Sequence, residues 1–121
     1  MGHNRSRLND LAGRAAEDAV ARACEARGQR VLGRRWRGRG GEIDLVTESN
    51  SEIVFVEVKK SSSHAKAALR LSETQARRIM TAAEEYLGRF ATGLLTPMRI
   101  DLATVDRDGR VAFVENAVGE F

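Results

Sequence analysis

Three residues near the middle of the chain have the side chains that metal-dependent phosphate chemistry requires. Asp44 and Glu57 carry carboxylates, and Lys59 follows Glu57 closely. Carboxylate oxygens are the ligands that Mg²⁺ prefers, and such sites are completed by water and by phosphate oxygens of the substrate. A neighbouring lysine can orient or deprotonate a water molecule, or stabilise negative charge that develops on a phosphate. The three residue types therefore predict a site for phosphoryl transfer.

Two predicted strands would bring these three side chains together. Residues 42–47 and 52–60 have strand composition, and the residues between them are typical of a hairpin loop. Side chains two residues apart on a strand share a face, so Glu57 and Lys59 are expected on one face of the second strand. We expect Asp44 beside them on the first strand. The constellation then lies at the end of a strand whose apolar run predicts burial on both faces.

The backbone next to this trio offers a further candidate ligand. Val58 lies between Glu57 and Lys59, and its carbonyl oxygen is expected to contribute to the metal site. Strict alternation on the preceding strand would place Ile43 and Leu45 together on one face. A Glu-x-Lys pair on a strand is also a common surface ion pair, worth a few tenths of a kcal/mol. The motif alone leaves the metal site and the surface pair open.

The rest of the chain predicts the order α-β-β-β-α-β-β. Periodic apolar residues indicate helices over 14–27 and 72–87, and the second helix starts with a capping box formed by Ser72 and Gln75. Residues 61–71 show no clear period and are expected to form a mobile loop. The other predicted strands are residues 29–37, 99–105 and 110–114. This order indicates an α/β (α+β) fold, with a mixed central β-sheet flanked by helices.

Length and composition predict one soluble domain. We expect a flexible N-terminal segment over residues 1–12 and a single domain over 13–121 of the 121 residues. The longest apolar runs are too short to span a bilayer, and no signal-peptide pattern is present, so we expect no membrane association. Cys24 is the single cysteine, which excludes an intrachain disulfide. The expected location is the cytoplasm.

The basic residues favour a polyanionic partner. The net charge is +3, and arginine far outnumbers lysine among the 20 basic residues. The planar guanidinium of arginine suits phosphate oxygens, which it can bind through two hydrogen bonds. The alternative is a solvated surface rich in arginine. The candidate nucleic-acid contacts are Arg34, Arg35, Arg37, Arg39 and Lys60.

Taken in order, these motifs resemble the PD-(D/E)XK signature of restriction-endonuclease-type nucleases. More narrowly, the chain resembles the YraN family of small bacterial proteins, which are described as endonuclease-like and related to Holliday junction resolvases. The matching stretches are residues 13–17, 35–37, 41–46, 55–59, 75–78, 82–87, 99–102 and 114–117. The sequence departs from the family pattern at Lys60 and Ser61, where Thr-Arg is usual. The loop that follows also lacks the Phe-Gly and Pro-rich pattern often seen there.

The resemblance implies a restriction-endonuclease-like core and a role for each matching residue. Asp44 and Glu57 would bind the metal, and Lys59 would be the catalytic lysine. Glu17 matches the position of an additional acidic residue in resolvase-like relatives, and Gln75 matches a polar position that often faces the active site. An exposed carboxylate favoured by the helix dipole is the alternative for Glu17. Helix capping alone is the alternative for Gln75.

Other polar and sulfur-containing residues are better explained by structural roles. Glu42 and Asp101 are weak site candidates, since each has an arginine nearby in the sequence. Cys24 is expected to be a buried thiol, because no histidine or second cysteine is close to it in the sequence. Trp36 could stack on a base, but core packing is the favoured interpretation of a single tryptophan in a small domain.

The function implied by the resemblance is that of an endonuclease dependent on Mg²⁺ or Mn²⁺. It would hydrolyse phosphodiester bonds, with DNA favoured over RNA and with branched or single-stranded structures as candidate substrates. The alternative is a non-catalytic nucleic-acid-binding module on a nuclease fold. A weaker third hypothesis is a protein that docks a protein partner through its sheet edge or arginine face. A homodimer is expected by analogy with junction-cutting enzymes, which cut two strands.

Overall fold

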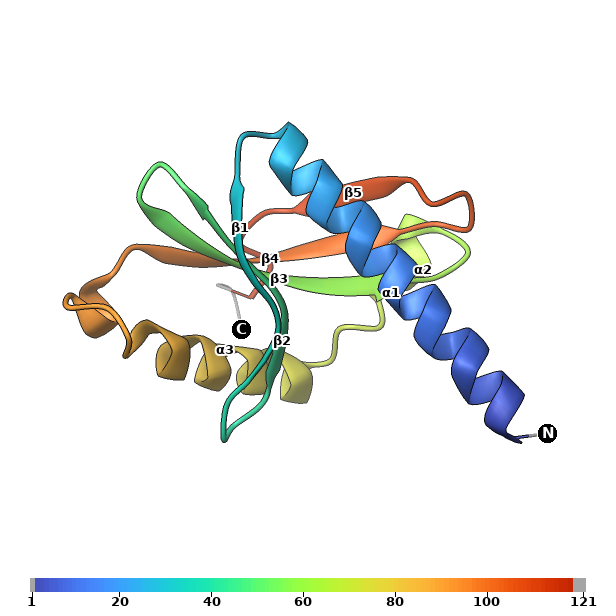
Figure 1. The fold of residues 1–121 in the computed structure, drawn as a ribbon, viewed down its shortest axis with the longest axis horizontal. Helices are drawn as coiled ribbons and strands as arrows, with labels where there is room; N and C mark the ends of the chain where they lie inside the picture. The colour runs from blue at the N-terminus through green and yellow to red at the C-terminus, as the bar shows by residue number, and fades with distance from the viewer. Residues whose placement is uncertain (1, 119–121) are drawn as a thin grey trace.

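A five-stranded sheet lies between two long helices in the computed structural model, which describes the backbone of residues 2–118 and the side chains of residues 11–118 (Figure 1). The elements in chain order are α1 (Gly2–Ala26), β1 (Arg30–Arg37), β2 (Glu42–Ser49), β3 (Glu52–Lys60), α2 (His64–Ala68), α3 (Glu73–Leu87), η1 (Gly93–Leu95), β4 (Met98–Val105) and β5 (Val111–Val114). The predicted α+β class, with a mixed sheet flanked by helices, is confirmed.

The strands follow one another across the sheet in the order β1-β2-β3-β4-β5. Neighbouring strands are antiparallel except for β3 and β4, which are parallel, with Phe55 beside Ile100. A parallel pair needs a long crossover connection, and here α2, α3 and η1 form it. The crossover therefore begins at the carboxyl end of β3, where Glu57 and Lys59 lie.

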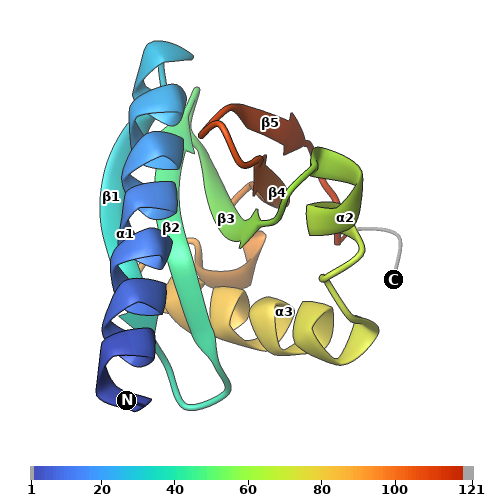
Figure 2. The ribbon, with the colours of Figure 1, turned by 90° about the vertical axis from the view of Figure 1, so that its right-hand side faces the viewer.

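Each face of the sheet is covered by one long helix. α1 contacts all five strands on one face, whereas α3 packs against the other, as Figure 2 shows. The apolar run of β3 is buried on both sides: Phe55 packs with the α3 cluster, and Val54 and Val56 pack with the α1 cluster. This confirms the expected interior strand.

The face assignment predicted for β2 is wrong at one residue. Ile43 packs with Val46 in the cluster under α3, whereas Leu45 packs with the cluster under α1. Strict alternation would have placed Ile43 and Leu45 on the same face. Alternation fails around Asp44, where the pairing of β2 with β3 stops after Leu45. On the other side of β2, Arg35 of the neighbouring strand β1 has a positive φ of 51°, which further distorts the regular pleat of the two strands.

α1 begins twelve residues before the predicted helix start, over the range expected to be a flexible segment. Residues 2–7 contain no apolar side chain, and the three apolar residues that follow, Leu8, Leu11 and Ala12, were too few to extend the predicted helix. Residues 2–12 contain no proline and only Gly2 as glycine, so nothing in the sequence stops a helix there. The predicted stop at Gly28 is confirmed, because this glycine has a φ of +85°. None of the described helices is long and apolar enough to cross a membrane.

A short helix interrupts the segment predicted to be a loop. α2 begins after Ser63, whose hydroxyl accepts a hydrogen bond from the backbone N–H of Lys66 at 3.2 Å. A single helical turn is too short to give a periodic pattern, which explains why it was missed. His64 connects this helix to β4: its Nδ1 lies 2.7 Å from Thr104 Oγ1, and its Nε2 lies 3.5 Å from Asp106 Oδ2.

The glycines between β1 and β2 form a loop that packs directly on α3. A Cβ atom at Gly40 would lie 2.5 Å from the Thr81 side chain, and one at Gly41 would lie 3.0 Å from a backbone oxygen of α3. The backbone N–H of Arg39 donates to Glu85 Oε2 at 2.8 Å. Only glycine allows so close an approach. The loop therefore holds the hairpin that carries Asp44 against α3.

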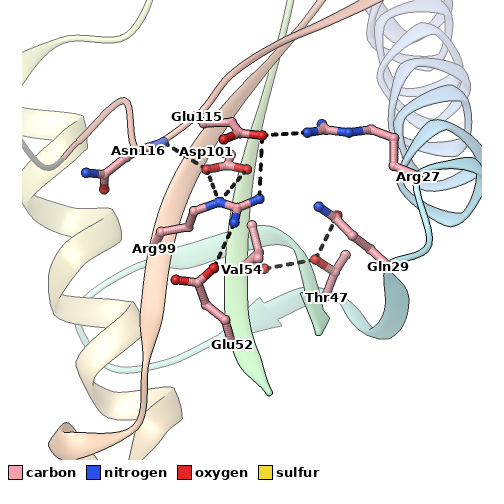
Figure 3. Close-up of polar contacts among 9 residues, drawn as sticks. All are labelled: Arg27, Gln29, Thr47, Glu52, Val54, Arg99, Asp101, Glu115 and Asn116. Atoms are coloured by element: carbon pink, nitrogen blue, oxygen red, sulfur yellow. Dashed lines mark hydrogen bonds and ion pairs between the residues drawn. The ribbon is translucent and has the colours of Figure 1, made fainter. Parts of the chain in front are cut away.

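A network of charges ties β4 to the neighbouring elements (Figure 3). The Arg99 guanidinium contacts Asp101 at 3.0 Å and Glu52 at 2.7 Å. Asp101 is almost fully buried. Glu115 lies at the edge of the network, 2.7 Å from Arg27 and 3.9 Å from Arg99. The salt-bridge alternative for Asp101 is therefore confirmed.

Candidate active site

Asp44 lies at the point where β2 separates from β3. The backbone pairing of these strands ends at Leu45 and Val56. One residue further on, the carboxylate of Asp44 replaces the missing strand partner: its Oδ2 accepts a hydrogen bond from the N–H of Val58 at 2.8 Å. This bond fixes the Asp44 side chain over the end of β3. Val58 thus contributes through its N–H, and a role for its carbonyl oxygen stays a prediction.

Glu57 lies beside Asp44 and is contacted by two further side chains. Lys59 Nζ lies 3.3 Å from Glu57 Oε1, and Gln75 Nε2 donates to the same oxygen at 3.3 Å. The backbone N–H of Gln75 donates to Ser72 Oγ, which confirms the Ser72 half of the predicted capping box, whereas the Gln75 side chain bonds Glu57. Gln75 therefore both belongs to the cap and reaches Glu57, which joins α3 to the end of β3.

Burial makes both carboxyl groups of this pair bind protons more tightly than they would in water. Burial, then the nearby charge of Asp44, raises the pKa of Glu57 to about 8, and Lys59 only partly offsets this. Burial also raises the pKa of Asp44, while hydrogen bonds from Val58 and Glu57 act in the opposite direction. The Asp44 carboxylate is held at the N–H of the residue that directly follows Glu57. A single lysine does not neutralise two recessed carboxylates.

Glu17 belongs to α1, so it approaches Asp44 and Glu57 from the face of the sheet opposite α3. Its negative charge raises the pKa of Asp44, which places Glu17 in the electrostatic neighbourhood of the site. The Glu17 side chain is only 16% exposed and lies 2.9 Å from Arg35 Nε. Because α1 starts at Gly2, Glu17 is far from the first turn, and the helix-dipole alternative is wrong.

The chemistry of these donors fits a hard divalent cation in an open site. Asp44 and Glu57 offer two neighbouring carboxylates, and Mg²⁺ is often held by one or two carboxylates together with water and substrate phosphates. Within the described side chains, no group of three or more His, Cys, Asp or Glu residues is arranged to hold a metal ion. A closed structural site with four protein ligands, such as those of zinc, is therefore not formed by them. The set fits an ion that keeps water ligands.

Most of the arginines predicted to bind nucleic acid are paired with carboxylates. Arg34 contacts Asp18 at 2.5 Å, and Arg35 contacts Glu17. Arg37 is largely exposed but lies 3.4 Å from Glu42, which confirms the ion-pair interpretation of that glutamate. The backbone of Arg39 is tied to α3. Most of these arginine charges are therefore compensated in separate ion pairs and are not clustered at Glu57.

An open groove of about 620 Å³ adjoins the acidic pair. It is lined by residues that include Gly13, Val58, Lys59, Lys60, Ser61 and Arg70. The Arg70 guanidinium donates to the Lys60 carbonyl oxygen at 2.8 Å. Arg70 and Gly13 were not predicted as site residues, because nothing in the sequence indicates that a residue of α1 and one after α2 meet at the end of β3.

Cys24 lies in the core, and Trp36 packs against it. Cys24 is on the buried side of α1, and burial raises the pKa of its thiol to about 11. Trp36 packs against the α3 cluster, with its ring edge-to-face with Tyr86 at a centroid distance of 5.4 Å. Both structural interpretations are confirmed.

The profile of the uncharacterised protein family UPF0102 matches residues 16–105, which include the whole acidic pair and its strands. The chain is 52% identical over 116 residues to a UPF0102 protein of Ruegeria pomeroyi, covering 96% of this chain and 94% of that protein. It is 53% identical over 106 residues to a UPF0102 protein of Cereibacter sphaeroides, covering 88% and 91%. A UPF0102 protein of Roseobacter denitrificans is 50% identical over 109 residues, covering 90% and 84%. None of these names states an activity.

Proposed function

The chain belongs to the uncharacterised protein family UPF0102, and from the geometry of its own site we propose that it is a metal-dependent endonuclease of the PD-(D/E)XK type. Its substrate would be nucleic acid, with DNA favoured over RNA, and its cofactor Mg²⁺ or Mn²⁺. The observation that carries the proposal is that the Asp44 carboxylate is bound to the N–H of Val58, directly after Glu57, while Lys59 Nζ lies 3.3 Å from Glu57.

Each side chain has a distinct role in this proposal. Asp44 and Glu57 would hold the divalent cation, and Gln75 keeps Glu57 in position through its amide. When bound, the cation supplies positive charge beside the scissile phosphate and so favours attack by water. Lys59 would donate hydrogen bonds to the attacking water or to a phosphate oxygen, because its ammonium group already lies at the acidic pair. Glu17 adds negative charge that favours cation binding.

The test is cleavage of labelled branched and linear DNA in Mg²⁺ and in Mn²⁺. We expect Asp44→Asn, Glu57→Gln and Lys59→Met each to lower the rate by at least about 100-fold, since each removes a charge at the reacting phosphate. Asparagine is chosen at position 44 because its side-chain oxygen can still accept from the Val58 N–H. Glu73→Gln, an exposed carboxylate of α3, is the matched control and should retain full activity. Cleavage that survives all three substitutions would disprove the assignment.

A second candidate function is a nucleic-acid-binding module that does not cleave. The observation that favours it is the open groove lined by Lys59, Lys60 and Arg70, because basic side chains can bind a phosphate backbone without any ion. Calorimetric titration with Mn²⁺ separates the two functions. An endonuclease requires ion binding that is lost in Asp44→Asn, whereas a pure binding module shows DNA affinity without any ion binding at the pair.

A further inference from the structure

The basic side chains at the groove differ from the arginines of β1 in how their charge is compensated. Arg34, Arg35 and Arg37 each lie within ion-pair distance of a carboxylate. Among the described residues, no carboxylate lies within that distance of Lys60 or Arg70. The uncompensated positive charge near Glu57 is therefore concentrated at the groove.

Two residues connect the groove to the acidic pair. Lys59 lines the groove and also lies 3.3 Å from Glu57. Val58 lines it as well, and its N–H is the donor to Asp44. A chain that enters the groove would thus pass directly to the two carboxylates. Figure 2 shows the carboxyl end of β3 between α1, α2 and α3, which is where this path lies.

Arg70 is held in place for contact with an anion. Its guanidinium donates to the Lys60 carbonyl oxygen at 2.8 Å, which links the segment after α2 to the end of β3. One N–H of a guanidinium makes this bond, and an arginine has five such donors in a rigid fork. The anchored fork can present its other donors to phosphate oxygens with little further loss of side-chain freedom.

The opposite wall of the groove is backbone at Gly13. Glycine inside a helix costs roughly 1 kcal/mol relative to alanine, so its presence in α1 needs a reason. A Cβ atom at Gly13 would meet nothing within 4 Å. Packing within the protein therefore does not require glycine here. Open space above the helix backbone permits a ligand to approach it closely.

We propose that this groove binds the sugar-phosphate backbone of a nucleic-acid strand next to the phosphodiester at the acidic pair, with Arg70 and Lys60 contacting its phosphates. This inference rests on the proposed function, according to which the reacting phosphodiester lies at the acidic pair. It adds that the neighbouring part of the same strand is bound in the groove. It also shifts the expected phosphate contacts from the β1 arginines to the groove.

The first experiment measures DNA affinity in EDTA, where cleavage and cation binding play no part. Fluorescence anisotropy follows a labelled single-stranded and a labelled branched DNA between about 50 and 200 mM salt. The double variant Lys60→Gln, Arg70→Gln should lose at least about tenfold in affinity at low salt, and the slope of log affinity against log salt should fall by roughly 1 to 2. Arg30→Gln, a basic residue at the amino end of β1 that pairs with Glu48, is the control and should change affinity less than about twofold.

The second experiment does not disturb the bond between Arg70 and Lys60. Gly13→Gln places a side chain in the open space and should lower affinity at least about fivefold at an unchanged or higher melting temperature. Unchanged affinity of Gly13→Gln, or equal losses in the double variant and in Arg30→Gln, would overturn the proposal. Absence of any DNA binding by the wild-type chain at low salt would also overturn it.

Mn²⁺ calorimetry distinguishes failure of the groove from failure of the proposed function. The groove variants should bind Mn²⁺ as the wild type does, because none of them changes Asp44 or Glu57. If the wild type binds no ion but the groove variants still lose DNA affinity selectively, the groove is supported and the endonuclease is not. If ion binding is normal and the groove variants bind DNA normally, the endonuclease is supported and the groove is not.

Discussion

Two clusters of recessed carboxyl groups lie at different places on the same sheet, and their charges are balanced in different ways. On β4, the Arg99 guanidinium faces Asp101 at 3.0 Å, and the backbone N–H of Asn116 donates to the same carboxylate at 2.9 Å. At the end of β3, Lys59 Nζ lies 3.3 Å from Glu57, and the nearby charge of Asp44 raises the pKa of Glu57. Both oxygens of the Asp101 carboxylate lie against an arginine, whereas Asp44 and Glu57 have a single lysine beside them.

This difference separates a structural ion pair from a candidate site. A buried carboxylate with a well-oriented arginine is stable within the protein and has no need of a ligand. A pair of carboxylates with too little compensation gains from binding a cation. Position on a strand and burial are similar for Glu57 and Asp101, so the balance of charge is what distinguishes them.

The largest effect is expected from removing the arginine of the β4 cluster. Arg99→Leu leaves Asp101 buried without its cation, which should lower the free energy of unfolding by about 3 to 5 kcal/mol. Urea-induced unfolding measures this. Arg77→Leu breaks an exposed ion pair with Glu73 on α3 and should cost less than about 0.5 kcal/mol. Similar losses in the two variants would contradict the distinction between the clusters.

The acidic pair should make the stability of the metal-free protein fall as pH rises. The pKa of Glu57 is about 8 in the folded chain against an ordinary value of 4.5. Between these values the folded chain holds a proton that the unfolded chain has released, so raising the pH favours unfolding. We expect a loss of about 2 to 4 kcal/mol from pH 5 to pH 8 in urea unfolding with EDTA.

Glu57→Gln is the control for this pH dependence, because glutamine cannot titrate and its side-chain oxygen can keep the bond from Gln75. The variant should lose most of the decline in stability between pH 5 and pH 8. A decline of the same size in the variant and in the wild type would show that Glu57 is not its source.

Divalent cations should stabilise the protein through the acidic pair alone. An ion at 100 times its dissociation constant adds about 2.7 kcal/mol to the free energy of unfolding. The corresponding rise in melting temperature with Mn²⁺ should vanish in Asp44→Asn and persist in Glu115→Gln, which alters the other cluster. A rise that persists in Asp44→Asn would place the ion elsewhere.

The smallest effect is expected at the edge of the β4 cluster. Glu115 is 58% exposed and bridges Arg27 and Arg99, so solvent already screens its charge. Glu115→Gln should lower the free energy of unfolding by less than about 1 kcal/mol. A loss as large as that of Arg99→Leu would show that Asp101 depends on the whole network and not on Arg99 alone.

Much of the fold was predictable because several segments have unambiguous local patterns. The bounds of β3 match the prediction, since its apolar run is framed by turn residues on one side and charges on the other. The start of α3 was predicted from Ser72, whose hydroxyl caps it. The expected grouping of Asp44, Glu57 and Lys59 is also observed, because it depends on neighbouring strands joined by a short hairpin.

The parts that escaped prediction depend on contacts between distant segments. The partners of Arg34 and Arg35 lie on α1, so the sequence did not show that their charges are compensated. The groove needs α1 and the segment carrying Arg70 to meet at β3, which no local pattern encodes. The separation of β2 from β3 at Asp44 likewise depends on tertiary structure. At this point the Val58 N–H is bound by the Asp44 side chain and not by the backbone of β2.

Because the glycine loop packs closely on α3, this loop is a poor site for inserting a peptide tag. A peptide tag between Gly38 and Gly41 would push the hairpin off Thr81 and Glu85 and so displace Asp44. The turn at Asn50 and Ser51, at the far end of the next hairpin, is exposed and makes no comparable contact among the described residues. Tags and fluorescent labels therefore belong at that turn, where they leave the acidic pair undisturbed.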